Sequence, residues 1–440
     1  SQTTAASQTT AASQTTAAWL PESCPCPDCK SDQTRGGALL DVLLGIDVGT
    51  TNTKACIYAP DGRVLALSSA PTPTVAEGPR RATQDPEVLI AAVYAAMRRA
   101  MEQLPSSARV AGLAVASVGE AGVPLDAHDR PLYPIIAWFD ERSAPQAAWW
   151  ATEVGETRIY HYTGLPLGHT FTLNKLLWLR EHHPGVIAHL VRWLCISDYV
   201  AFCLTGQARM GYSLASRTMA FDLAQRHWCG ELLAAAEFSA DCLPEPVAEG
   251  TLLGHVTPAA ARASGLPAGT PVYVGGHDHV CGALAMGAWE PGVVLDSTGT
   301  TEAELTTVEA VEPYLQAADL SFCLGCHVAR GRYYAIGSIL AAGSLLSWLA
   351  GLLWPGADPG NRQDALVALT AAAAQSPAGA RGLYVLPHLD GAGSPDRCST
   401  ARGVLLGLGL AHTREDLARG VIEGLAYELR TLWEALERFT

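Results

Sequence analysis

The stretch DVGTTNTK, residues 47–54, follows directly on the apolar run LLGI at 43–46 and decides the fold. It predicts a strand, a tight turn at Gly49 and a second strand. Glycine lets the backbone amides of such a turn face inward, and threonine hydroxyls and the Lys54 ammonium group add donors for phosphate oxygens. Asp47, at the end of the first strand, could hold a metal ion through water. An ordinary hairpin rich in turn residues is the alternative, and this stretch alone does not decide between the two.

A second stretch of the same kind, DSTGTT at 296–301, follows the apolar run GVVL at 292–295. The repeated strand-turn-strand unit predicts two related lobes with their boundary near residues 289–292. A cleft between lobes is where ligands commonly bind, and two facing loops of amides and hydroxyls suit the phosphates of a nucleotide. Neither loop matches the Walker pattern G-x-x-x-x-G-K-[ST], which excludes a P-loop enzyme.

The composition limits the class of protein. The chain has 440 residues and a formal net charge of −14, which allows two or three domains and repels a nucleic-acid backbone. Its 12 cysteines are scattered and no export signal precedes the first strand, so we expect a cytoplasmic protein. Residues 333–357 carry no charge, but glycines interrupt them; they predict a buried strand and a core helix rather than a membrane span.

The first 40 residues differ from the rest of the chain in composition and in hydrophobic pattern. They contain three copies of SQTTAA and a Pro/Cys cluster, and because nothing in them is periodic enough to bury a face, we expect a disordered leader over residues 1–40. Cys24, Cys26 and Cys29 lack a fourth ligand nearby, so chance spacing is favoured over a weak metal site.

From Leu43 onward the chain alternates between strand and helix patterns. A helix is predicted at about 86–103, with Asp85 as its N-cap, and it is followed by the apolar strand ARVAGLAVAS at 108–117. This alternation predicts an α/β protein whose mixed sheet carries helices on its faces.

The strand YVGG at 273–276 leads into His277, Asp278 and His279. A carboxylate in this place can accept the proton of a substrate hydroxyl while a metal ion and backbone amides carry the charge of a transferred phosphoryl group. The alternative is that Asp278 only caps a helix that begins at Val280.

Motifs along the rest of the chain resemble the FGGY carbohydrate kinases, the group that includes glycerol, xylulose, ribulose, gluconate and fuculose kinases. The motifs are GIDVGTTNTKA, IIAWFDERS, TGLPLGHTFTLNKLLWL, DYVAFCLTG, YSLASRTMAFDL, GGHDHVCGALAMG, LDSTGTTEAE, AAGSLLSWL, VLPHLDGAGSPD and ARGVIEGLAYEL. The resemblance runs from about Leu43 to Thr440. It implies a two-lobed actin- and hexokinase-like (ribonuclease H-like) ATPase fold that closes over a sugar and ATP with Mg²⁺, with the N-terminal lobe at 41–289 and the C-terminal, nucleotide-binding lobe at 290–440.

The resemblance also implies roles for single residues. Asp278 matches the family's catalytic base, and Asp47 matches its metal-associated carboxylate. The matching cofactor-binding residues are Thr50, Thr51, Asn52, Lys54, Gly299, Thr300 and Gly343. The matching substrate-binding residues are Glu120, Trp138, Asp140, Arg142, Thr170 and His279.

The segment that holds Trp138, Asp140 and Arg142 has two interpretations. In one, the indole packs on the apolar face of a sugar and the carboxylate accepts its hydroxyls. In the other, Asp140 and Arg142 form a buried structural ion pair. The sequence does not separate them.

The chain departs from the glycerol kinases beside the sugar. Gly119 stands where those enzymes carry an arginine, and Thr170 stands where they carry a tyrosine. Because smaller side chains leave space, we expect a substrate bulkier than glycerol: a pentulose, a deoxyketose or a sugar acid, with a ketose such as xylulose or fuculose favoured.

A second departure concerns the end of the chain, because the family continues past the helix at 414–439 into a glycine-rich adenosine loop. We therefore expect an incomplete second lobe, and a non-catalytic sugar-binding remnant as the alternative to an active kinase. The expected partner is a small-molecule sugar or polyol, with no nucleic acid and no membrane, and a homodimer is allowed.

Overall fold

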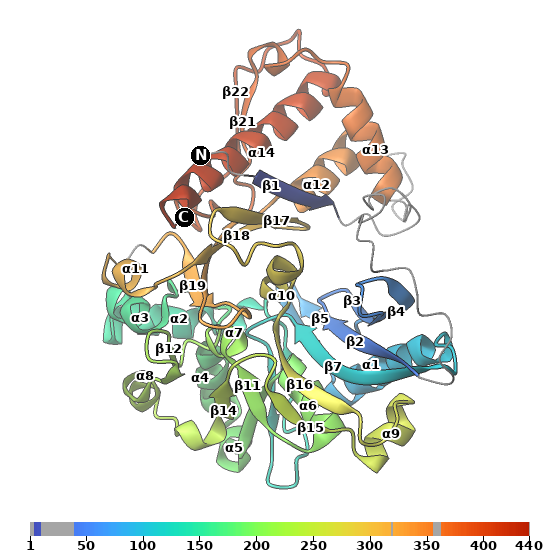
Figure 1. Cartoon of the computed structure of the whole chain (residues 1–440). Coiled ribbons are helices and arrows are strands. Elements are labelled where there is room, and N and C mark those ends of the chain that lie inside the picture. The colour runs from blue at the N-terminus through green and yellow to red at the C-terminus, as the bar shows by residue number, and fades with distance from the viewer. Residues whose placement is uncertain (1–3, 10–38, 318–319, 355–361, 440) are drawn as a thin grey trace.

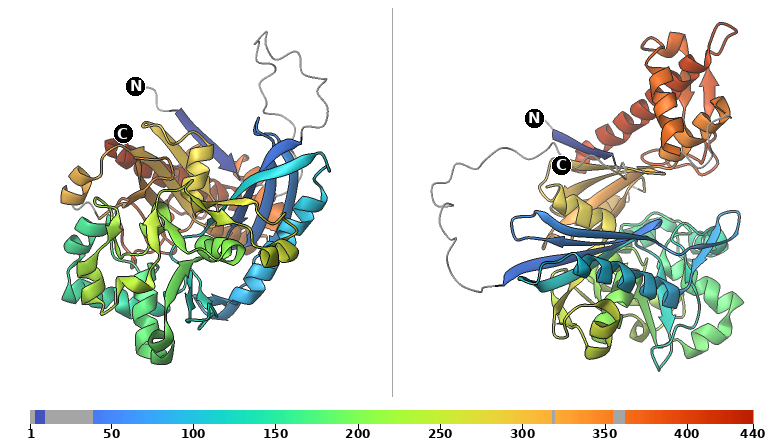
Figure 2. Two further views of the ribbon diagram at one scale, coloured as in Figure 1. Left: turned by 60° about the horizontal axis from the view of Figure 1, so that its bottom comes forward. Right: turned by 90° about the vertical axis from the view of Figure 1, so that its right-hand side faces the viewer.

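The computed structural model describes residues 4–9, 39–317, 320–354 and 362–439. They form two lobes: residues 39 to about 289, coloured blue to yellow, form the N-terminal lobe, and the following residues, coloured dark yellow to red, form the C-terminal lobe together with the dark-blue residues 4–9 (Figure 1; Figure 2). Each lobe is built on its own sheet with helices packed on it, as the repeated strand-turn-strand unit predicted. Among the described residues, no helix is both long enough and apolar enough to cross a membrane.

The N-terminal lobe is centred on a six-stranded mixed sheet with the order β15-β16-β7-β2-β3-β4. The central strands β2, β7 and β16 run parallel to one another, while the outer pairs are antiparallel. The strands are β2 (Leu40–Val48), β3 (Asn52–Tyr58), β4 (Val64–Pro71), β7 (Ala108–Ser117), β15 (Leu252–His255) and β16 (Pro271–His277). The prediction of a mixed sheet and the strand at 108–117 are confirmed.

Helix α1 (Pro86–Glu102) packs on this sheet against β3 and β4. Asp85 caps it as predicted, because one carboxylate oxygen accepts the N–H groups of Glu87 and Val88 at 2.8 and 3.1 Å. Leu89, Val93 and other residues at helical spacing are fully buried in the same core as the inward-facing residues of β2.

The remaining elements of the N-terminal lobe are helices and short strands outside this sheet. Most of them lie between residues 135 and 247. The helices are α2 (Ala144–Glu153), α3 (Glu156–Thr163), α4 (Thr172–His182), α5 (Pro184–His189), α6 (Ile196–Thr205), α7 (Tyr212–Ala215), α8 (Gly230–Ala235), α9 (Pro258–Ser264) and α10 (Asp278–Ala285). The short strands are β5 (Val75–Gly78), β6 (Arg81–Gln84), β8 (Gly122–Leu125), β9 (Ile135–Ile136), β10 (Arg192–Cys195), β11 (Arg209–Gly211), β12 (Phe221–Asp222), β13 (His227–Trp228) and β14 (Glu245–Val247).

The C-terminal lobe carries a five-stranded sheet with the order β1-β17-β18-β20-β19. Its strands are β1 (Thr4–Thr9), β17 (Val293–Thr298), β18 (Glu302–Val308), β19 (Cys323–Cys326) and β20 (Tyr333–Ile339), with a separate hairpin of β21 (Tyr384–Leu386) and β22 (Val404–Leu406). Its helices are α11 (Glu312–Ala317), α12 (Gly343–Leu353), α13 (Arg362–Ala373) and α14 (Arg414–Leu436). The uncharged run that begins at Tyr333 is strand β20 followed by helix α12, as predicted.

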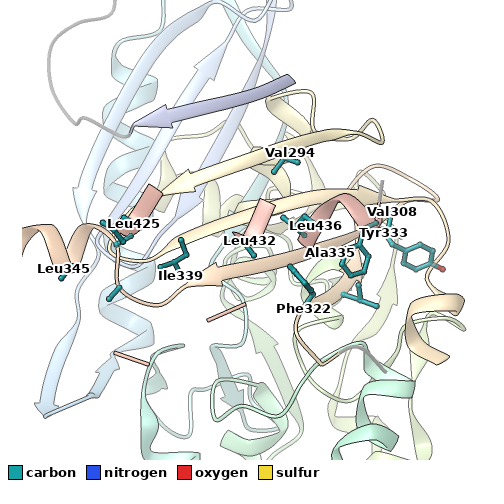
Figure 3. Packing of buried hydrophobic residues seen from close by; sticks show 14 of the residues in the cluster. Val294, Val308, Phe322, Tyr333, Ala335, Ile339, Leu345, Leu425, Leu432 and Leu436 are labelled. Carbon is teal, nitrogen blue, oxygen red and sulfur yellow. The ribbon is translucent and has the colours of Figure 1, made fainter. Parts of the chain in front are cut away.

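The core of this lobe lies between the sheet and α14 (Figure 3). Leu432 and Leu436 of α14 pack there with Phe322 and Ile339. A capping box starts the helix, since the side chain of Asp416 accepts the backbone N–H of Thr413 at 2.9 Å.

The prediction of a disordered leader over residues 1–40 is wrong for part of that segment. Residues 4–9 form β1, which pairs parallel with β17 along the edge of the C-terminal sheet. An edge strand presents unpaired N–H and C=O groups, and an extended stretch such as this one can pair with them. Most of the rest of the leader, including the cluster Cys24, Cys26 and Cys29, lies outside the described residues.

Candidate active site

Three parallel strands bring the predicted catalytic residues to one edge of the N-terminal sheet. Ala116 of β7 pairs with Asp47 of β2 on one side and with Gly276 of β16 on the other. The carboxyl ends of β2, β7 and β16 therefore meet, and this is the edge where ligands of open α/β sheets bind. Asp278 follows β16 directly as the first residue of α10.

Asp278 is held in an enclosed, polar setting. Its carboxylate accepts the backbone N–H of His279 at 2.7 Å, and His277 Nε2 lies 3.4 Å from the same oxygen. Burial raises the pKa of Asp278 to about 6, and the negative charge of Asp47 adds to this. Burial and the nearby Arg217 hold the pKa of His277 well below its usual value, so this imidazole is neutral. Such a carboxyl is ionised near neutral pH and remains basic enough to accept a proton.

The first threonine-rich loop is the turn between β2 and β3. Asp47 lies opposite Lys54 in the strand register, and the carboxylate and ammonium groups are 3.6 Å apart. Burial raises the pKa of Asp47 above its usual value, although Lys54 opposes the shift. The indole Nε1 of Trp138 donates to the Thr50 hydroxyl at 2.9 Å, which ties this loop to the segment beside the predicted sugar pocket.

The second loop, between β17 and β18, is also closed by a bond from its glycine, although that bond spans one residue fewer than in the first loop. Gly49 N–H donates to the carbonyl of Asn52 at 3.1 Å, and Gly299 N–H donates to that of Thr301 at 2.9 Å. Helix α12 begins against this second loop, because Gly343 N–H donates to the Gly299 carbonyl at 3.0 Å. A Cβ atom at position 343 would come within 2.3 Å of that carbonyl oxygen, so the contact requires glycine.

A cavity of about 220 Å³ lies between the lobes. Its N-terminal wall includes Thr50, Gly119, Glu120, Trp138, Arg217, Asp278 and His279, and its C-terminal wall includes Thr301, Ala303, Cys323, Gly337, Ser338 and Arg397. The predicted base, one threonine of the first loop and three of the predicted sugar residues therefore share one cavity with the second loop. The other predicted cofactor residues, Thr51, Asn52, Lys54, Gly299, Thr300 and Gly343, belong to the two loops and the start of α12 but do not line the cavity.

Glu120 is the most strongly held of the predicted sugar residues. Its carboxylate pairs with Arg217 at 2.5 Å, and its carbonyl accepts the Thr172 hydroxyl at 2.9 Å. Its backbone has a φ of 62°, a left-handed conformation that such contacts must maintain. Lys175, which is fully buried beneath it, contacts the carbonyls of Glu120 and Thr170, and burial lowers the pKa of this lysine to about 8.

Three predicted sugar residues lie outside the cavity lining. Asp140 and Arg142 form a buried two-point ion pair at 2.8 Å, and Arg142 also pairs with Glu77. Asp140 uses its second oxygen for the backbone N–H of Ala82 as well, so the geometry fits the structural ion pair rather than direct sugar contact. Thr170 presents its carbonyl to Lys175 and does not line the cavity.

Arg217 is the cavity residue that the sequence did not reveal. It lies 97 positions from Glu120, in the segment YSLASRTMAFDL, and its side chain passes 3.2 Å from where a Cβ atom at Gly119 would stand. Arg217 therefore takes up part of the space beside Gly119 from another part of the chain, while Gly119 still lines the cavity, and the expectation of a substrate bulkier than glycerol stays a prediction. The only sequence signal was the arginine's place in that family motif.

The described residues contain no group of three or more His, Cys, Asp or Glu side chains arranged to hold a metal ion. Asp296 and Glu304 do lie opposite each other in the β17–β18 pair, and burial raises the pKa of Asp296 to about 7 and that of Glu304 to about 8. Asp47 does not line the cavity, but its charge contributes to the raised pKa of Asp278, which does.

Comparisons with known proteins agree with this geometry. Models of the FGGY family of carbohydrate kinases match residues 42–285 with the N-terminal domain and residues 297–439 with the C-terminal domain. The xylulose kinase of Klebsiella pneumoniae is 32% identical over 388 residues, which cover 88% of this chain and 77% of the relative. The gluconokinase of Bacillus subtilis (strain 168) is 28% identical over 404 residues, covering 90% of this chain and 76% of the relative.

Among solved structures, the xylulose kinase of Rhodospirillum rubrum superposes with a TM-score of 0.83 at 31% identity and covers 90% of this chain and 79% of that protein. The two-lobed actin- and hexokinase-like fold is therefore confirmed. Both family domains are matched, so the alternative of a non-catalytic remnant has no support. The chain belongs to the FGGY family of carbohydrate kinases, which transfer a phosphoryl group from ATP to a sugar hydroxyl.

Proposed function

We propose that this kinase phosphorylates a ketose of the xylulose type and that Asp278 is its general base. The observation that carries the proposal is the place of Asp278: a carboxyl with only 23% of its side-chain surface exposed and a pKa raised to about 6, in the wall of an inter-lobe cavity that also contains threonines of both loops. The relatives named xylulose kinase support the choice of sugar.

The sugar would bind on the N-terminal wall. Glu120 can accept sugar hydroxyls, and Arg217 fixes that carboxylate so that it need not reorganise when substrate enters. The indole of Trp138 offers an apolar face to the carbon skeleton, while its N–H is already used by Thr50. His279 adds a further polar group beside Asp278.

The phosphates would lie between the two threonine-rich loops, whose amides and hydroxyls suit phosphate oxygens. Asp47, at the end of β2 and separated from β16 by β7 alone, fits a water-mediated contact to Mg²⁺, which would neutralise charge on the phosphates when bound. Asp278 takes the proton from the attacking hydroxyl, and closure of the lobes excludes water from the cavity. We expect this chemistry in the cytoplasm, with residues 41–289 binding the sugar and residues 290–440 the nucleotide.

Replacing Asp278 by Asn tests the base. We expect kcat to fall by about 10²–10⁴-fold while the sugar still produces a thermal shift. The variant should be no less stable at pH 7, because the folded state already disfavours the ionised carboxylate: its pKa is raised, so its ionisation costs stability as the pH rises through about 6. The exposed Asp61→Asn is the matched control and should keep the full rate. An unimpaired D278N enzyme would refute the role.

A sugar acid is the second candidate substrate. The gluconokinase relatives support it, and so do two arginines in the cavity, Arg217 and Arg397, which could bind a carboxylate. Phosphorylation assays with D-xylulose, L-fuculose, D-gluconate and glycerol at equal concentrations decide between the two. A kcat/KM for gluconate above that for both ketoses would replace the ketose proposal, and glycerol as the best substrate would contradict both.

A further inference from the structure

A second and larger cavity, of about 380 Å³, lies elsewhere between the lobes. It shares no lining residue with the active-site cavity. The N-terminal lobe contributes Tyr212, Arg226, Ala248, Glu249 and Thr251, and the C-terminal lobe contributes Cys326, His327, Arg330, Gly331 and Arg332. None of these residues has a role in the proposed phosphoryl transfer.

The walls of this cavity are rich in positive charge. Arg332 is paired with Glu309, but Arg330 makes no ion pair with any of the residues described. Arg226 packs its guanidinium over the ring of Tyr333 at 4.8 Å, and its buried Nε–H finds no acceptor in the part of the chain that the structure describes. Two guanidinium groups that form no ion pair within the described ranges therefore come from different lobes to the same cavity.

His327 adds a third donor without a partner. It is only 3% exposed, and its Nδ1 accepts the backbone N–H of Ala329 at 2.9 Å. Burial lowers the pKa of this imidazole to about 4, so it is neutral and must carry its hydrogen on Nε2. Nε2 has no hydrogen-bond partner among the described residues. Buried donors are nearly always satisfied, so this one is available to an acceptor that enters the cavity.

Glu249 is the acidic group in the wall, and it does not oppose an anion strongly. Its carboxylate accepts the backbone N–H of Ser213 at 2.7 Å, and burial raises its pKa to about 7, so a large part of it is neutral near neutral pH. The hydroxyl of Ser213 in turn accepts the N–H of His277 at 3.0 Å, next to Asp278. The cavity is thus connected to the catalytic strand by two hydrogen bonds.

We infer that this cavity is a binding site for a phosphate group, either inorganic phosphate or a phosphate monoester. Arginines recognise phosphate oxygens with paired N–H groups, and a neutral imidazole N–H donates to the same kind of acceptor. The volume accommodates a phosphate with a small organic group attached. Because the donors come from both lobes, a bound phosphate group stabilises the lobe arrangement seen here, which couples the site to the catalytic cleft.

Calorimetric titration of the full chain with inorganic phosphate tests the site. Arg330→Gln, an exposed change, should weaken binding by about tenfold, as the loss of one charge-assisted hydrogen bond implies. Arg226→Gln should weaken it similarly. The control Arg430→Gln makes the same charge change on α14, away from the cavity, and should leave the affinity unchanged. Equal affinity in wild type and R330Q, or no binding at millimolar phosphate, overturns the inference.

A histidine signal separates this site from the catalytic cleft. In ¹⁵N-histidine-labelled protein, phosphate should shift the Nε2 resonance that disappears in His327→Asn, and it should do so equally in the Asp278→Asn enzyme. A shift confined to other histidines would place the phosphate elsewhere and overturn the inference. The same titration with fructose 6-phosphate distinguishes the sources: tighter binding than that of free phosphate assigns the site to a monoester, and weaker binding assigns it to inorganic phosphate. This test needs no kinase activity, so its failure is distinct from failure of the proposed function.

Discussion

At the scale of single residues, the environment of Asp278 turns an ordinary carboxyl into a candidate base. The side chain is the same as that of Asp61 in an exposed turn, but burial at the end of β16 raises its pKa to about 6. A carboxylate with that pKa accepts protons better than an exposed one and is still about nine-tenths ionised at pH 7. Asp278 and Asp61 therefore differ in proton affinity because their surroundings differ.

This setting predicts the pH dependence of the enzyme. The base must be ionised, so kcat/KM should fall about tenfold per pH unit below pH 6 and level off above it. Initial rates from pH 5 to 8 at low sugar concentration measure this limb. His279→Gln is the comparison variant: the acid limb should remain and move to higher pH, because the charge of His279 lowers the pKa of Asp278. If the limb disappears in H279Q, it belongs to that imidazole and the assignment to Asp278 is wrong.

Arg217 predicts a second effect at this scale. Glu120 is buried and pairs with the largely covered Arg217 at 2.5 Å, so Arg217→Met leaves a buried carboxylate without its partner and should cost about 3–5 kcal/mol of the free energy of unfolding. It should also raise the KM for the sugar.

The double variant Glu120→Gln/Arg217→Met checks the cause of that loss. It removes the uncompensated charge and should recover much of the stability, but not the KM, in denaturant unfolding and kinetic assays. A double variant as unstable as the sum of both single variants would show that the two side chains act independently.

At the scale of elements, the start of α12 is fixed to the second threonine-rich loop. Gly343 N–H and Ser344 N–H donate to the carbonyls of Gly299 and Thr300 at 3.0 and 3.1 Å. The N-terminus of α12 is therefore hydrogen-bonded to the loop. The absence of a side chain at Gly343 permits the close contact between its backbone and the Gly299 carbonyl. The helix and the loop act as one unit although they are separated along the chain by β18, α11, β19 and β20.

Gly343→Ala should disrupt this unit. Its Cβ atom would meet the Gly299 carbonyl at 2.3 Å, so the loop and the helix must separate. We expect a loss of about 1–3 kcal/mol in stability and a higher KM for ATP with a smaller change in the KM for the sugar. Gly351→Ala is the matched control in the same helix: nothing lies within 4 Å of its Cβ, and alanine favours the helix by about 1 kcal/mol. Equal behaviour of the two variants would contradict the packing argument.

At the scale of the whole molecule, buried hydrogen bonds join the lobes, such as that from Cys326 N–H to the Ser216 hydroxyl at 3.0 Å, and an exposed ion pair joins them as well. Arg80 of the N-terminal lobe pairs with Glu141 of its own lobe at 2.5 Å and also with Asp390 of the C-terminal lobe. Such surface pairs add little to stability, at most about 1 kcal/mol. A contact of this size can still shift the balance between open and closed arrangements of the lobes.

Asp390→Asn should therefore leave the unfolding midpoint almost unchanged but increase the radius of gyration of the ligand-free protein in small-angle scattering. Added salt should produce the same increase in the wild type, because it screens exposed charges. Glu141→Gln removes the contact of Arg80 within one lobe and should not change the radius of gyration. An unchanged radius in D390N would show that other contacts set the lobe arrangement.

The sequence by itself determined where single helices, strands and turns lie, and it indicated phosphoryl transfer as the type of reaction. Asp85 before Pro86 was enough to place α1, and the repeated Gly-Thr turns after apolar runs were enough to predict two lobes around a phosphate-binding cleft. These signals are local, because caps, turns and strand ends depend on residues within a few positions of one another.

Only the tertiary structure decided what surrounds those signals. Arg217 takes up part of the space beside Gly119, Asp140 saturates its hydrogen bonds with Arg142 and Ala82, and the two lobes together enclose the phosphate-binding cavity inferred here. Each of these contacts joins segments that the chain order separates, or depends on whether a side chain faces a cavity or the protein interior. Burial and pairing of this kind arise from packing in three dimensions, and no spacing along the sequence encodes them.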